Sequence, residues 1–236
     1  EAVCLDGGGS TTLGATLPDS DTMSLINSPS DGAQRLVTNA IFLVSHLSPT
    51  GVLGSFYVTP SENLLLAGAS QSLTASPVDS AWHPMRAGPT VRWSLSSGGG
   101  SVDGNGVFTA GDNAGLSVVT ASSGQASGSA SLVVVADPDR ILLAHEATGK
   151  AVTSLALAPG QSMDLSANAI YKKLPLVAQD TCFIWSVEGT AGTVDASGLF
   201  TAADQTGSGT LTVTAGRTSV SIPISVAGHI LPLDDF

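Results

Sequence analysis

The chain has 236 residues, of which 42% are hydrophobic, 11% are charged and 5% are aromatic, and its formal net charge is −11. With only 8 basic residues, scattered along the chain, it lacks the positive patch that nucleic-acid binding needs, and an anionic membrane surface is excluded as a partner for the same reason. No apolar run approaches the roughly 18 residues that span a bilayer, so no membrane insertion is expected.

The charged fraction is less than half of the usual quarter of a soluble chain, and small and β-branched residues take its place. This composition favours short strands joined by tight turns. The two cysteines, Cys4 and Cys182, lie far apart, which excludes a CxxC metal site. Cys182 lies in a strand-like run at 181–185 and is expected to be a buried small hydrophobe.

Residues 1–50 form a segment of their own. In chain order we expect a strand at 2–5, a glycine loop at 6–10, a strand or helical turn at 10–16, a strand at 23–27, a turn at 28–32 and a strand at 40–45.

The glycine loop, Asp6-Gly7-Gly8-Gly9-Ser10, brings flexible backbone next to a carboxylate and a hydroxyl. The loop does not match three known glycine motifs. It lacks the lysine that ends a P-loop. It also lacks the final glycine of the nucleophile elbow and of the dinucleotide-binding fingerprint. A plain glycine turn therefore stays open as an alternative.

An internal repeat organises residues 52–228. Blocks recur at a constant offset of 185 − 93 = 92 residues: Trp93-Ser94-Leu95 as Trp185-Ser186-Val187, Val102-Asp103 as Val194-Asp195, and Gly106–Ala110 as Gly198–Ala202. Within the second copy Leu211, Val213 and Ala215 alternate with threonines, which is the pattern of a half-buried strand. A period of this length is about that of one small sandwich domain.

Each copy is expected to carry a core tryptophan, Trp93 or Trp185, and a turn that begins at Asp103 or Asp195. The Asp103 turn departs from a calcium loop because Val107 and Phe108 stand where a ligand and a glycine belong. With its W-S strand, V-D-x-x-G-x-F-x-A segment and T-A strand, each copy resembles bacterial Ig-like domains of group 2. Such domains are spacers or adhesive modules outside the cell.

The N-terminal segment resembles the C-terminal end of phosphodiester glycosidases of the uncovering-enzyme type. Asp6 to Ser10 match the family's D-G-G-G-S loop, and Arg35 and Asn39 match a second segment that returns beside it. The resemblance implies Asp6 and Arg35 as catalytic residues and Gly7, Gly8, Gly9, Ser10 and Asn39 as substrate-binding residues. Asp6 as a turn cap and Arg35 as a solvated surface charge remain the alternatives.

These observations give a mainly β fold class, with two tandem Ig-like β-sandwiches preceded by a partial α+β catalytic remnant. The expected domains are the remnant at 1–50, sandwiches at 51–136 and 137–228, and a linker at 229–236. Strands at 2–5, 23–27 and 40–45 would have unpaired edges, so the segment is expected to be disordered, to dock on the first sandwich, or to pair with another copy of the chain.

The main functional expectation is a fragment of a secreted bacterial hydrolase that cleaves a sugar from a sugar-1-phosphodiester, inactive by itself because most of the catalytic domain is missing. Whether the chain is an enzyme is left open, and no cofactor or metal is expected. The alternative is a cell-surface adhesive or carbohydrate-binding module without catalysis. The loop Trp82-His83-Pro84 is either a glycan contact or a loop edge that packs on its own domain.

Overall fold

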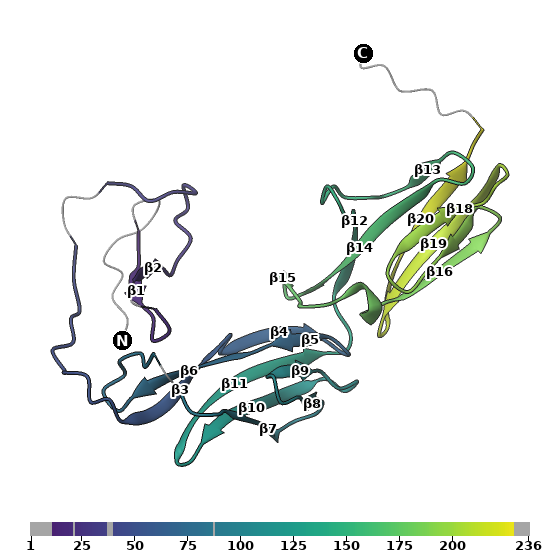
Figure 1. The fold of residues 1–236 in the computed structure, drawn as a ribbon. Coiled ribbons are helices and arrows are strands. Elements are labelled where there is room, and N and C mark those ends of the chain that lie inside the picture. The colour runs from purple at the N-terminus through teal and green to yellow at the C-terminus, as the bar shows by residue number, and fades with distance from the viewer. Residues whose placement is uncertain (1–10, 21, 37–39, 87, 229–236) are drawn as a thin grey trace. The chain divides into compact units, whose positions relative to one another are not determined.

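The fold is that of a computed structural model, which describes residues 11–20, 22–36, 40–86 and 88–228. Within these ranges the secondary structure is β throughout, apart from one three-residue 3-10 turn, Asp180–Cys182 (Figure 1). The mainly β fold class is confirmed. The α+β remnant expected in 1–50 is wrong for its described residues, which contain two short strands and no helix.

The described residues divide into two compact units, and each is treated by itself. The first unit contains the described residues up to 59, together with 74–92 and 121–129. The second contains 60–73, 93–120 and the described residues from 130 onward.

The first unit begins with a two-stranded antiparallel ribbon of β1 (Gly14–Thr16) and β2 (Met23–Leu25). Asn27 closes this ribbon, because its Oδ1 accepts a bond of 2.7 Å from the Leu13 amide and its Nδ2 donates to the Thr11 carbonyl at 2.8 Å. The strands expected around 10–16 and 23–27 are therefore present, in shortened form. The turn expected at 28–32 is also present, closed by a 2.9 Å bond from the Gly32 amide to the Pro29 carbonyl.

The strand expected at 40–45 is wrong, because residues 40–50 form neither a strand nor a bridge. An apolar run becomes a strand only when a neighbouring strand takes up its backbone hydrogen bonds, and none of the described residues does so here. The next strand, β3 (Leu53–Thr59), pairs antiparallel with β6 (Thr74–Asp79). Phe56 and Val58 are buried on one face of this pair, and Val78, which pairs with Ser55, is buried on the other.

The second unit is a series of short strands joined by tight turns. They are β4 (Glu62–Leu66), β5 (Ser70–Ser72), β7 (Arg92–Ser97), β8 (Ser101–Val102), β9 (Val107–Thr109), β10 (Gly115–Ser123), β11 (Ala126–Val135), β12 (Arg140–His145), β13 (Leu155–Leu157), β14 (Ser162–Tyr171), β15 (Leu174–Pro175), β16 (Ile184–Gly189), β17 (Gly192–Val194), β18 (Leu199–Ala202), β19 (Gly207–Ala215) and β20 (Thr218–Val226). The ends of β7, β10 and β11 run on into the first unit.

The strand order repeats along the chain as the sequence does. A four-stranded sheet β4-β11-β10-β7 with a small sheet β5-β9-β8 precedes a four-stranded sheet β13-β20-β19-β16 with a sheet β12-β14-β18-β17. In each copy the first of these sheets has one parallel pair, β4 with β11 and β13 with β20. In the second copy the remaining pairs, β19 with β20 and β16 with β19, are antiparallel. The second copy is thus a β-sandwich of two sheets (Figure 1).

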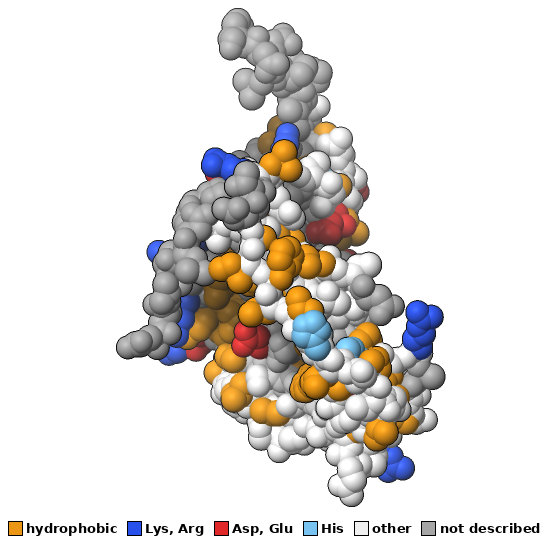
Figure 2. Space-filling model, turned by 90° about the vertical axis from the view of Figure 1, so that its left-hand side faces the viewer, with side chains coloured by type: hydrophobic (Ala, Val, Ile, Leu, Met, Phe, Trp, Pro, Cys, Tyr) orange, Lys and Arg blue, Asp and Glu red, His pale blue; other side chains and the backbone are white. Residues whose placement is uncertain are grey.

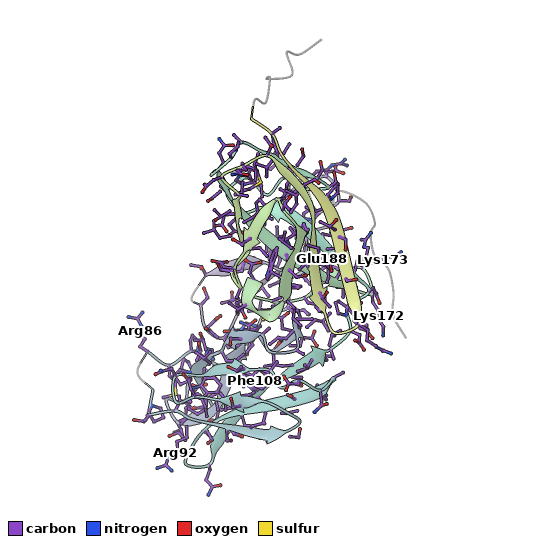
Figure 3. The ribbon with its side chains drawn as sticks, turned by 90° about the vertical axis from the view of Figure 1, so that its right-hand side faces the viewer. Arg86, Arg92, Phe108, Lys172, Lys173 and Glu188 are labelled. Carbon is purple, nitrogen blue, oxygen red and sulfur yellow. The ribbon has the colours of Figure 1, made fainter. Side chains whose placement is uncertain are left out.

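The core of each copy is centred on a phenylalanine. Phe108 and Phe200 are fully buried, and the alternation expected for β19 is confirmed because Leu211 and Val213 are buried as well. Figure 3 shows Phe108 among the strands of its sheets. Full burial of such a side chain stabilises a fold by about 2–3 kcal/mol.

The two tryptophans expected in the core are only half-buried. Each lies over the glycine that ends the Asp turn: a Cβ on Gly106 would lie 2.7 Å from Cε2 of Trp93, and one on Gly198 would lie 3.1 Å from Cζ2 of Trp185. Trp185 also donates its indole N–H to the Asp180 carbonyl at 2.9 Å. The indole N–H needs a hydrogen-bond acceptor, and this favours a position at the edge of the core.

The turns expected at Asp103 and Asp195 are confirmed. Oδ1 of Asp103 accepts the amides of Asn105 and Val107 at 2.9 and 2.8 Å. Oδ1 of Asp195 accepts the equivalent amides of Ser197 and Leu199 at 2.9 and 3.0 Å. One carboxylate oxygen of each aspartate thus accepts two backbone amides, as in an ordinary Asx turn.

Candidate functional site

Most of the residues predicted as a site lie outside the described residues. This applies to Asp6, Gly7, Gly8, Gly9, Ser10 and Asn39, whose roles stay predictions. Arg35 is described, and its exposed guanidinium forms an ion pair with Asp31, four residues earlier in the chain.

Among the described residues of the first unit, the carboxylate that accepts the most hydrogen bonds is that of Asp79, at the end of β6. Its Oδ2 accepts the amides of Thr50 and Gly51 at 2.5 and 3.2 Å, and its Oδ1 accepts the amides of Ala81 and His83, both at 2.9 Å. Its side chain is only 2% exposed. Burial acts to raise the pKa of Asp79, but the four N–H donors outweigh this effect and hold the pKa well below its ordinary value.

The loop that Asp79 organises presents Trp82 to solvent. The ring is 61% exposed, although Trp93 and Trp185 are half-buried. The backbone of Trp82 has φ = 63°, a left-handed conformation that is uncommon for any residue other than glycine and more so for a bulky one. The Trp82 amide donates to the Asp79 carbonyl at 3.0 Å. Trp82 therefore closes the turn and is also the residue with the strained backbone conformation.

His83, the next residue, ties this loop to the chain before β3. Its Nε2 lies 2.7 Å from the carbonyl oxygen of Leu47. Ser80 adds a 2.9 Å hydroxyl contact to Thr50 and a 3.0 Å amide bond to the Val52 carbonyl. The loop is therefore held in place by side-chain and backbone bonds from residues about 30 positions away.

Sequence reasoning missed Asp79. An Asp just before Ser80 and Ala81 is a usual start for an Asx turn, so the local bonds to Ala81 and His83 had a signal. The bonds to Thr50 and Gly51 had no signal in the sequence, because they depend on two distant segments meeting in space.

A second surface feature belongs to the second unit. Most outward side chains of β16, β19 and β20 carry hydroxyls, and we call them the hydroxyl face: Ser186, Ser208, Thr210, Thr212, Thr214, Ser219, Ser221 and Ser225. Ile184, Glu188 and Pro223 point outward on the same side. Across the strands Ser186 aligns with Thr212 and Thr212 aligns with Ser221, with 2.9 Å between the last two hydroxyl oxygens. Glu188, labelled in Figure 3, is the sole charged residue of these three strands.

The first copy carries related hydroxyls on β7 and β10, where the oxygens of Ser96 and Thr120 lie 2.6 Å apart. Figure 2 shows one face of the molecule, on which hydrophobic side chains gather in patches and charged side chains are scattered among white polar surface. Uncharged polar surface of this kind suits a neutral, hydroxylated partner, since it offers donors and acceptors without ionic groups that must be desolvated.

Two further ionisable groups of the described residues have shifted pKa values without forming a site. Burial raises the pKa of Asp180, against the Ala167 amide bond that lowers it, and Glu146 and Asp164 raise it further. Burial also raises the pKa of Cys182, which lies in the 3-10 turn and is half-buried, where a strand had been expected. Over the described ranges, no group of His, Cys, Asp and Glu side chains could hold a metal ion.

No helix in the described part of the chain is both long and apolar enough to cross a membrane. No family model matches the sequence. The chain is 28% identical over 180 residues to Ice-binding protein 1 of Shewanella frigidimarina. The match covers 76% of this chain and 19% of that protein, so the chain spans about a fifth of its relative's length.

Two solved structures illustrate the structural comparison. The adhesin InvE of Yersinia pseudotuberculosis has a TM-score of 0.30 at 17% identity, covering 75% of this chain and 60% of its own. Domains 4–9 of the surface layer protein SbsC have a TM-score of 0.33 at 14% identity, covering 74% and 31%. TM-scores of this size support no conclusion about function.

The resemblance to a phosphodiester glycosidase followed by group 2 Ig-like domains is wrong, and so is the function derived from it. The relative found over most of the chain is an ice-binding protein, and the described residues contain no α+β remnant. Glycine, serine and aspartate are common in turns of any fold, so the pattern that suggested a catalytic loop also fits a plain turn.

Proposed function

We propose that the chain is a non-catalytic binding module of an extracellular or cell-surface protein, and that it contacts carbohydrate through the Trp82 loop. The observation that carries the proposal is an exposed tryptophan held at φ = 63° by a buried, fully bonded aspartate. Strained backbone persists only where surrounding bonds enforce it, and it is concentrated at binding and catalytic sites. An exposed indole offers a flat apolar face with an N–H at its edge.

The architecture proposed around this loop is two tandem Ig-like sandwiches, over 51–136 and 137–228, with 1–50 and the linker 229–236 as flanking segments. The repeated strand order and the repeated parallel pairs, β4–β11 and β13–β20, support this division. An extracellular or surface location suits a chain with few charges and with polar, hydroxyl-rich outer strands.

The test is binding of the whole chain to a glycan array and to insoluble polysaccharides. Trp82→Ala is expected to weaken binding about tenfold or more, which corresponds to ~1.4 kcal/mol. Leu116→Ala is the matched control, since Leu116 is 54% exposed and lies on β10. Binding that Trp82→Ala leaves unchanged, or no binding to any glycan, would contradict the proposal.

A second candidate function is contact with ice through the hydroxyl face. The supporting observations are the aligned, nearly uncharged Ser and Thr side chains and the relative named for ice binding. Thr212→Lys is expected to lower the fraction of protein taken into growing ice, because a charge enters the centre of the face. The control is Asn168→Lys on β14, an exposed position of the other sheet.

Equal uptake of the wild-type chain, the Thr212→Lys variant and a non-binding reference protein would reject this second candidate. Uptake that falls equally in the Thr212→Lys and Asn168→Lys variants would also reject it, since the effect would then come from charge in general.

A further inference from the structure

The segment before β3 exposes an unusual run of apolar side chains. Residues 40–47 read Ala-Ile-Phe-Leu-Val-Ser-His-Leu, and all of them are exposed. The exposed fractions of Ile41, Phe42, Leu43 and Val44 are 79%, 72%, 99% and 67%. Contiguous exposed apolar surface of this kind is rare on soluble monomers and marks interaction sites.

The C-terminal end of this segment is fixed to the first unit. His83 holds the Leu47 carbonyl, and Asp79 holds the Thr50 and Gly51 amides. Pro49 follows the apolar run and would end a strand formed by it, because proline has no backbone N–H to donate. The segment is therefore attached to the first unit at its C-terminal end.

The chemistry of residues 40–47 is that of a strand that pairs with its own kind. The run has no charge, no proline, no glycine and several β-branched or aromatic residues, which is the composition of self-pairing segments. In a strand, alternate residues of this run point to opposite faces, and both faces carry apolar side chains. Burial of both faces is therefore favourable.

We propose that residues 40–46 pair antiparallel with the same residues of a second copy of the chain, forming a two-fold dimer. Antiparallel pairing about Leu43 places Phe42 opposite Val44 of the second copy, an aromatic and β-branched pair of the kind that stabilises sheets. Identical segments related by a two-fold axis close the contact and satisfy the inner backbone groups of both.

Two further observations favour a second copy as the partner. No Asp, Glu, Lys or Arg lies within 40–50, so none of the residues behind the chain's net charge of −11 lies at the contact. The first unit also exposes the apolar side chains of Leu13, Met23, Leu25 and Ile26. A stable dimer buries about 800 Å² per partner, an area that one strand pair alone does not supply.

The experiment is sedimentation velocity of the full chain from low micromolar to near-millimolar concentration, with hydrogen exchange on the same samples. We expect a concentration-dependent dimer in which alternate amides of residues 40–46, those that face the second strand, become protected as the dimer forms. Leu43→Glu is expected to give monomer at every concentration, because it puts like charges opposite each other. Leu174→Glu, at a 54% exposed position on β15, is the matched control and is expected to dimerise as the wild type does.

Three outcomes would overturn the proposal: a wild-type chain that stays monomeric throughout, a dimer that Leu43→Glu leaves intact, or a dimer in which all amides of residues 40–46 stay unprotected. Since residue 43 is 99% exposed, its substitution leaves the melting temperature of the monomer unchanged, which separates a lost contact from a lost fold.

Discussion

The carboxylate of Asp79 accepts the amide of Thr50 at 2.5 Å, across 29 residues of sequence. This bond joins the segment that precedes β3 to the loop that follows β6, and the same carboxylate shapes the turn that carries Trp82. One buried side chain therefore positions both the proposed glycan contact and the anchor of the proposed dimer strand.

Stability at acid pH is expected to depend on Asp79. Its pKa is lowered on folding from an ordinary value of 3.8, so its contribution is complete above that pH and is lost as the pH falls below it. Thermal unfolding between pH 7 and pH 2 should show the wild type losing stability at the acid end. Asp79→Asn should melt lower at pH 7 and lose less on acidification. Parallel acid profiles for the two proteins would contradict this role.

Trp82→Gly is expected to melt higher than Trp82→Ala. Both substitutions remove the ring, but only glycine adopts φ = 63° without strain, and a left-handed conformation costs other residues about 1 kcal/mol. Urea unfolding of the two variants measures this difference directly. A Trp82→Ala variant as stable as Trp82→Gly would show that the loop relaxes once the ring is gone.

Gly106→Ala is expected to cost about 2–4 kcal/mol, more than the backbone strain alone. Its φ is 83°, and an added Cβ would also lie 2.7 Å from Trp93 and 2.8 Å from the Leu73 carbonyl oxygen, so overpacking adds to strain. Gly124→Ala is the control, because Gly124 has φ = 59° with nothing near the added Cβ. Equal losses of unfolding free energy in the two variants would show that the tryptophan contact contributes nothing.

Asp137→Ala is expected to lower the melting temperature more than Arg217→Ala. The Asp137 carboxylate accepts the Arg217 backbone amide at 2.8 Å as well as its guanidinium at 2.7 and 2.9 Å. Replacing Arg217 removes only an exposed ion pair, and such pairs contribute little. Melting curves at low and high salt test this, and the Asp137→Ala deficit should persist in high salt. A larger deficit for Arg217→Ala would assign the stabilisation to the ion pair.

The repeat could be predicted in some detail from the sequence. The constant offset located equivalent strands and turns in both copies, and Asp103 and Asp195 behave as expected because an Asx turn needs only neighbouring amides. The prediction that Trp93 and Trp185 are core residues was wrong, because both are half-buried. The size of the ring favours burial, whereas the indole N–H and the adjacent glycine favour a position at the edge of the core.

The first fifty residues show the opposite case. The apolar run at 40–45 has the composition of a strand but forms none, because strand formation depends on a partner that composition does not specify. The glycine loop was interpreted as catalytic for a similar reason. Its residues are those of a turn, and a turn of this composition is compatible with many functions.

The amino-acid sequence by itself determined a mainly β chain, its repeat, its alternating buried faces and its turns, because these follow from periodicity and from bonds between near neighbours. Only the tertiary structure decided that Asp79 is buried among four amides, that Trp82 is held outward in a strained conformation and that residues 40–47 are exposed. Each of these depends on which distant segments meet, and therefore on a balance of burial and hydrogen bonding that no local pattern encodes.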